Sequence, residues 1–226
     1  NNNSAVITGI INYNFEAKSF FNSLIVLGNK AAGQEKGSYR YGHKNRYSKN
    51  HLLPIGEFVP FEDLLRPIAP FFNLPMSSFK RGEYVQPNLI AKGISVLPLI
   101  CFEIAFPDQL AANYTQDTQL LLTVSNDAWF ADSHGPHQHM EIARMRALEF
   151  GRPLIRSTNT GITAAVDHRG EFINRLPQFE ESVLLSKIEL VEGTTPFSQH
   201  GRALIYLIAL LFSFYLITVD SKKNNV

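Results

Sequence analysis

The chain has 226 residues, of which 45% are hydrophobic and 18% are charged, and its formal net charge is +1. This balance is typical of a folded domain and excludes a disordered or low-complexity chain. The sequence has no basic tract, so nucleic-acid binding lacks electrostatic support. A single cysteine rules out an intrachain disulfide and a four-cysteine zinc site.

The chain opens on an apolar run over residues 5–11, which predicts a buried strand. A domain that starts on a core strand, with neither an initiator methionine nor a signal sequence, is expected to be the back part of a longer protein. Further strands are predicted over residues 23–27, 94–100, 120–124, 154–157, 162–166 and 183–186. Within one of these runs, Pro98 favours a sheet edge, a bulge or a strand start.

Helices are predicted between these strands. Pro107 suits the first turn of a short helix that ends at Asn113. Residues 137–151 predict a longer helix. Its apolar face would carry Met140, Ala143, Ala147, Leu148 and Gly151. Because strands and helices alternate, the sequence predicts a layered α/β domain.

Residues 203–219 form an uncharged apolar run, which as a helix would be about 25 Å long. This is the short limit for crossing a bilayer core, so the run predicts a transmembrane helix, with a buried core helix as the alternative. Lys222 and Lys223 follow it and place the C-terminus in the cytoplasm and the rest of the chain on the opposite side. The predicted parts are a domain over residues 1–200, the helix over 203–219 and a tail over 220–226.

Cys101 is the first candidate for chemistry. It follows a predicted core strand and precedes a turn into a helix, which is where α/β folds place reactive groups. A nucleophilic thiol and an inert buried cysteine both fit this position.

Lys49, Glu57 and Glu103 are the charged candidates. A lysine beside a thiol favours the thiolate and stabilises an oxyanion. The two glutamates lie among apolar neighbours, where a carboxylate is costly to bury without a partner. Together with Cys101 these residues would supply a nucleophile, an electrophilic helper and a base. The alternative is a set of ordinary surface charges.

Two further segments carry polar or aromatic groups. His134, His137 and His139 lie within six residues, but their spacing fits no zinc motif, so they are expected to cap a helix or line a pocket. Residues 125–130 form a polar loop directly after a core strand and contain the only tryptophan. Such a loop either lines a site or caps a helix.

Several strings resemble bacterial apolipoprotein N-acyltransferases, a membrane branch of the nitrilase (carbon–nitrogen hydrolase) superfamily. The resemblance covers nearly the whole chain, in the family's order, including the trailing hydrophobic helix. The strings are Tyr-Ser-Lys-Asn-His-Leu-Leu-Pro-Ile-Gly-Glu-Phe-Val-Pro (47–60), Pro-Met-Ser-Ser-Phe (75–79), Ile-Cys-Phe-Glu-Ile (100–104), Ser-Asn-Asp-Ala-Trp-Phe (125–130), Arg-Met-Arg-Ala-Leu-Glu (144–149) and Arg-Ser-Thr-Asn-Thr-Gly-Ile (156–162).

The resemblance implies a nitrilase-type αββα sandwich, here without its first strand and helix region, on the periplasmic face of the inner membrane. It assigns the nucleophile to Cys101 and the essential lysine to Lys49. Glu57 and Glu103 match positions that support the site. Phe102, where a tyrosine is usual, is expected to contact substrate together with Asn126 and Trp129.

The implied reaction has two steps and needs no cofactor. Cys101 takes an acyl chain from a phospholipid, and the N-terminal amine of a diacylglyceryl-cysteine apolipoprotein then takes it from the thioester. The family's general-base glutamate falls upstream of this chain, and neither Glu16 nor Glu35 has the matching context. One alternative is an amidase that uses the same cysteine and lysine on a small amide. The other is an inactive membrane-anchored fragment, because the general-base glutamate has no match in this chain. The apolar residues between 58 and 79 form either an apolar lid that dips into the lipid surface or an ordinarily packed long loop.

Overall fold

The computed structural model describes residues 4–16, 18–28, 43–54, 56–58 and 79–223. The predicted apolar lid lies almost entirely outside these residues. The first unit of the fold is a three-stranded antiparallel sheet in the order β1-β2-β3. Its strands are β1 (Val6–Asn14), β2 (Ser19–Leu27) and β3 (Arg46–Ser48).

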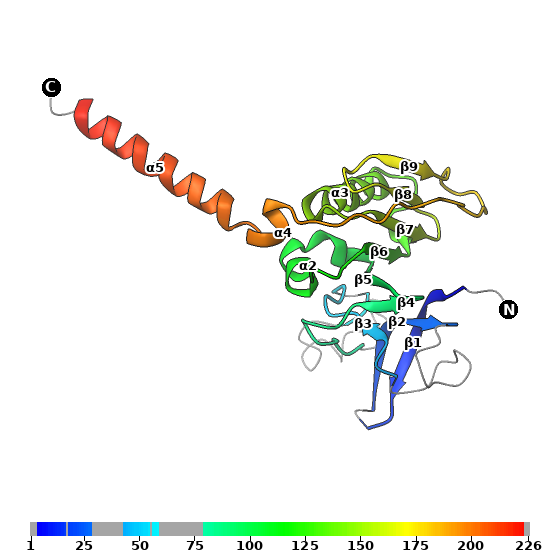
Figure 1. The fold of residues 1–226 in the computed structure, drawn as a ribbon. Coiled ribbons are helices and arrows are strands. Elements are labelled where there is room, and N and C mark those ends of the chain that lie inside the picture. Colours follow the sequence, from blue (N-terminus) through cyan, green and yellow to red (C-terminus); the bar gives the residue numbers. More distant parts are fainter. Residues whose placement is uncertain (1–3, 17, 29–42, 55, 59–78, 224–226) are drawn as a thin grey trace.

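The second sheet has six strands in the order β4-β5-β6-β7-β8-β9, with β5, β6 and β7 parallel (Figure 1). The carboxyl ends of these three strands therefore meet at one edge, where open α/β sheets bind their ligands. The strands are β4 (Leu89–Ala91), β5 (Ile94–Ile100), β6 (Leu120–Ser125), β7 (Leu154–Thr158), β8 (Ala164–Val166) and β9 (Phe172–Arg175).

Helices cover one face of the larger sheet, and the smaller sheet covers its other face. Leu97 and Leu121 of the large sheet pack with Met140 and Phe150 of α3 in the first core. Leu24 of the small sheet packs with residues of the large sheet in the second core. The described helices are η2 (Cys101–Ala105), α2 (Pro107–Asn113), η3 (Asp127–Phe130), α3 (Gly135–Phe150), α4 (Pro196–His200) and α5 (Ala203–Lys223). These layers correspond to the α-β-β part of the expected αββα sandwich.

Three details differ from the sequence predictions. β5 is an interior strand despite Pro98, but β4 pairs only with residues up to Val96, so Pro98 faces no partner on that side. No strand forms over residues 183–186, where Val183 and Leu185 are each 90% exposed. Leu148 of α3 is exposed rather than on the packed face.

The C-terminal helix α5 projects away from the sheets (Figure 1). Along its described length its apolar side chains are exposed, as Leu207 and Phe214 illustrate. Within the described part of the chain, no helix has both the length and the apolarity needed to cross a bilayer. The transmembrane helix predicted over residues 203–219 is therefore not confirmed.

Candidate active site

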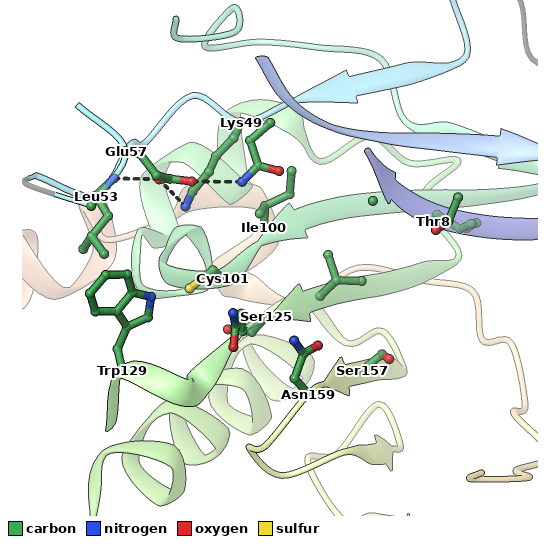
Figure 2. Close-up of a pocket in the computed structure, with 16 residues that line it drawn as sticks. Thr8, Lys49, Leu53, Glu57, Ile100, Cys101, Ser125, Trp129, Ser157 and Asn159 are labelled. Atoms are coloured by element: carbon green, nitrogen blue, oxygen red, sulfur yellow. Dashed lines mark hydrogen bonds and ion pairs between the residues drawn. The ribbon is translucent and has the colours of Figure 1, made fainter. Parts of the chain in front are cut away.

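Cys101 occupies a sharp bend between β5 and η2. It is the first residue after the strand, and its φ is +55°, in the left-handed region that residues other than glycine rarely adopt. Such strain persists only where the surroundings hold it, and it is common at reactive residues. The bend presents the sulfur at the carboxyl edge of the parallel strands, in a cavity of about 530 Å³ (Figure 2).

Lys49 enters the same cavity from the smaller sheet. It follows β3 directly and is 2% exposed, so its ammonium group needs a partner. Glu57 supplies one, with a distance of 2.6 Å between Nζ and Oε2 (Figure 2). The Glu57 carboxylate also accepts hydrogen bonds from the backbone N–H of Leu53 at 2.8 Å and from Nδ2 of Asn22 at 2.9 Å. Glu57 therefore both neutralises Lys49 and fixes its direction.

Glu103 does not line the cavity but joins its two sides. Its side chain is fully buried. One oxygen accepts the backbone N–H groups of Asn50 at 2.7 Å and His51 at 3.1 Å, directly after Lys49. The other accepts the N–H of Ile100 at 2.9 Å, directly before Cys101. Burial raises the pKa of Glu103, and these hydrogen bonds oppose the rise.

The three residues expected to contact substrate lie in different surroundings. Asn126 and Trp129 line the cavity, and Trp129 is 71% exposed at its mouth (Figure 2). The Asn126 side chain also accepts from the N–H of Ala128 and so caps η3. Phe102 is not among the lining residues, and its ring makes an edge contact with Phe106, with 4.9 Å between the ring centres.

The cavity also contains residues that the sequence analysis did not single out. Ser157 and Asn159 come from the end of β7, and Asn22 comes from the middle of β2. Asn22 had a visible signal, because it is a polar residue inside an otherwise mostly apolar strand. Ser157 and Asn159 had two signals, namely their place at and just after the end of a predicted strand and their place in the string over residues 156–162 that carries the family resemblance.

A buried polar network lies behind the cavity, between the sheet and α3. Nη2 of Arg156 donates to Oδ2 of Asp127 at 2.7 Å, and Oγ of Ser125 donates to Oδ1 at 2.6 Å. Burial opposes the charge of Asp127, but the contact with His139 and the charge of Arg156 outweigh it and lower the pKa of Asp127 to about 2. His139 is thus part of a buried network.

The other two histidines of that segment have different surroundings. His134 precedes α3 without making a side-chain cap, and His137 is exposed. Among the described residues no group of histidines, cysteines and carboxylates is arranged to hold a metal.

Known proteins share both the sequence and the fold. The chain is 58% identical, over 93% of its length, to an apolipoprotein N-acyltransferase of Photobacterium profundum, and 55% identical, over 95%, to one of Vibrio cholerae. It spans 40% and 42% of the length of these relatives. A crystal structure of a carbon-nitrogen hydrolase from Helicobacter pylori matches 91% of this chain, and 66% of that one, with a TM-score of 0.58 and 14% identity.

That structural match shows a nitrilase-like α/β fold. The family model for carbon-nitrogen hydrolases matches residues 1–195, which contain both sheets and all the residues of the cavity. The chain therefore belongs to the carbon–nitrogen hydrolase family.

Proposed function

We propose that this chain carries the active site of an enzyme that transfers an acyl chain from a phospholipid to the N-terminal amine of an apolipoprotein. The supporting observation is that Cys101, Lys49 and Glu57 line one cavity. The similar proteins are named apolipoprotein N-acyltransferases, which supports an apolipoprotein as the acceptor.

In the first step the sulfur of Cys101 attacks the carbonyl carbon of a phospholipid ester. A carbon–sulfur bond forms, the carbon–oxygen bond breaks, and the lysophospholipid leaves with the thiol proton. Lys49, held by Glu57, stabilises the negative oxygen of the tetrahedral intermediate. The proton passes through a general base, which we assign, following the family resemblance, to a glutamate upstream of β1.

In the second step the amine of a diacylglyceryl-cysteine attacks the thioester. An amide bond forms, the carbon–sulfur bond breaks, and the proton lost by the amine restores the thiol. The thioester divides one difficult transfer from ester to amide into two easier ones.

We also propose that the enzyme works at the inner membrane, with the domain over residues 1–200 on the periplasmic side. The exposed apolar surface of α5 supports contact with lipid. Trp129 supports it as well, because an exposed indole beside a cavity suits the membrane–water interface.

The test incubates the purified protein, with any upstream residues that its gene encodes, with phospholipid and a diacylglyceryl-cysteine peptide. Mass spectrometry is expected to find an acyl adduct on Cys101 that disappears when the peptide is added. Cys101→Ala should abolish both adduct and product, while Met145→Ala, an exposed change on α3, should leave them unchanged. Wild-type transfer by Cys101→Ala would reject the proposal, and hydrolysis of short amides without lipid transfer would favour the amidase alternative.

A further inference from the structure

We propose that His139 is a positioning residue that holds Cys101 in its strained conformation by donating a hydrogen bond to the Cys101 carbonyl oxygen. The inference rests on the proposed function, in which Cys101 is the nucleophile. Nε2 of His139 lies 3.2 Å from that oxygen. The bond connects His139 of α3 to Cys101, the first residue of η2, although the two residues lie far apart in the sequence.

The carbonyl of Cys101 matters because it is part of the bend that aims the sulfur. The φ of +55° is costly for a cysteine, and a strained backbone relaxes unless its surroundings hold it. A donor fixed on a long helix supplies such a restraint from outside the bend. Without it, relaxation of the φ angle of Cys101 would swing its Cβ and its sulfur away from the carbonyl carbon that the thiol attacks.

The direction of the bond follows from the chemistry of its two atoms. A carbonyl oxygen only accepts, so Nε2 must carry a hydrogen. Nδ1 has a partner in either protonation state of the ring. If Nδ1 is protonated it donates to Oδ1 of Asp127 at 3.2 Å, and if it is bare it accepts from Nη2 of Arg156 at 2.9 Å. The bond to Cys101 is therefore available to the neutral and the charged imidazole alike.

Asp127 and Arg156 keep the imidazole in this orientation. Both side chains are fully buried, and their ion pair is 2.7 Å long. Gly161 belongs to the same arrangement, because a Cβ at this position would collide with the Asp127 carboxylate. Asp127, His139 and Arg156 are all outside the cavity lining, so they act on the reaction only through residues that line it, which are Cys101 and, through its hydrogen bond to Asp127, Ser125.

Two variants test the two nitrogens of the imidazole separately. In His139→Gln the amide nitrogen reaches the position of Nε2 and still donates to the carbonyl of Cys101. In His139→Asn the shorter amide replaces Nδ1, keeps partners in Asp127 and Arg156, and leaves the carbonyl without its donor. Both changes retain a polar group in a polar site, which makes them a matched pair. His137→Gln, an exposed change on the same helix, is the control.

The measurement is the rate at which a thiol reagent alkylates the folded protein below its melting transition. Cys101 is the only cysteine, so the label reports on it alone. We expect His139→Gln to react within about threefold of the wild-type rate and His139→Asn at least about tenfold more slowly, as misplacement of a reacting atom predicts. Equal rates in the two variants, whether both fast or both slow, overturn the role of His139.

A parallel acyl-transfer assay separates this proposal from the proposed function. If the wild-type protein transfers no acyl chain but His139→Gln and His139→Asn still differ in alkylation, the assignment of substrate fails and the positioning role stands. If transfer occurs but the two variants alkylate alike, the positioning role fails and the proposed function stands.

Discussion

At the scale of single residues, the ion pair between Lys49 and Glu57 determines what the cavity can do. Removing a charged lysine from water is costly, and a carboxylate at 2.6 Å offsets that cost. The same contact points the ammonium group into the cavity that contains Cys101 (Figure 2). The ion pair between Lys49 and Glu57 is therefore expected to contribute both to the stability of the fold and to the reactivity of the site. Two variants separate these contributions.

Glu57→Gln should destabilise the protein by about 3 kcal/mol, because it leaves a buried ammonium group without its counter-charge. The double variant Lys49→Met/Glu57→Gln should recover most of that loss, since it removes the unpaired ammonium group while the amide oxygen still accepts the N–H of Leu53. Urea unfolding checks both expectations. The double variant should nevertheless lose acyl transfer, and retention of transfer would show that Lys49 has no role in the reaction.

The sequence singled out Cys101 and Lys49 as candidates, and they line one cavity, whereas it gave no sign of the network behind them. A strand end and a resemblance locate a thiol and a lysine without knowledge of the fold. Asp127, His139 and Arg156 come from η3, α3 and β7, and no local pattern shows that they meet. The cluster of three histidines was in fact a misleading signal, because only His139 is buried with partners.

At the scale of elements, Glu103 connects the segment that carries Lys49 to the bend that carries Cys101. Lys49 lies on the segment after β3 and Cys101 on the bend after β5, which belong to different sheets. One buried carboxylate accepts N–H groups from both segments, with one oxygen directed to each. Through these bonds Glu103 joins the two sides of the site without lining the cavity.

Glu103→Gln should loosen one of these two segments. An amide has one accepting oxygen, and its NH₂ group would face an N–H that has lost its acceptor. We expect a loss of about 1–3 kcal/mol for that unsatisfied donor. Hydrogen exchange followed by mass spectrometry should show reduced protection either around Asn50 and His51 or at Ile100. Unchanged protection in both segments would contradict the bridging role.

A comparison of the predicted and observed bounds of the strands and helices shows which sequence patterns predict structure locally. β5 and α2 have the predicted bounds, because an apolar run and a proline in a first turn are local signals. Residues 183–186 failed as a strand although the run has strand-forming residues. The segment lies beside the edge strand β9, where Nδ2 of Asn174 donates to the carbonyl oxygen of Leu185 at 3.2 Å and to Oγ of Ser186 at 3.1 Å, but these are side-chain contacts and no backbone ladder forms.

At the scale of the whole molecule, the site depends on how the two sheets face each other. The small sheet carries Asn22 and leads into Lys49, and the large sheet leads into Cys101. The core between the sheets consists of Tyr47 and of aliphatic residues from both sheets, including Leu24, Val96 and Leu122. The sequence predicted buried strands, but their division into two sheets followed only from the family resemblance.

Leu24→Ala should therefore slow the reactions at the site by more than its loss of folding stability explains. Leu24 is fully buried between the sheets, and its truncation should cost about 2–5 kcal/mol. Leu154→Ala is the matched control, because Leu154 is equally buried but lies in the core between the large sheet and α3. Both variants should show similar losses in urea unfolding.

Their effects on the alkylation of Cys101 and on acyl transfer should differ, however. A cavity between the sheets lets the Lys49 segment move relative to the Cys101 bend, so Leu24→Ala should slow both reactions several-fold while the folded fraction stays high. A cavity on the helix side leaves that relation intact, and Leu154→Ala should stay near the wild-type rate. If both variants slow the reactions in proportion to their stability, the packing between the sheets has no special part in forming the site, and the Glu103 bridge alone sets the distance between its two sides.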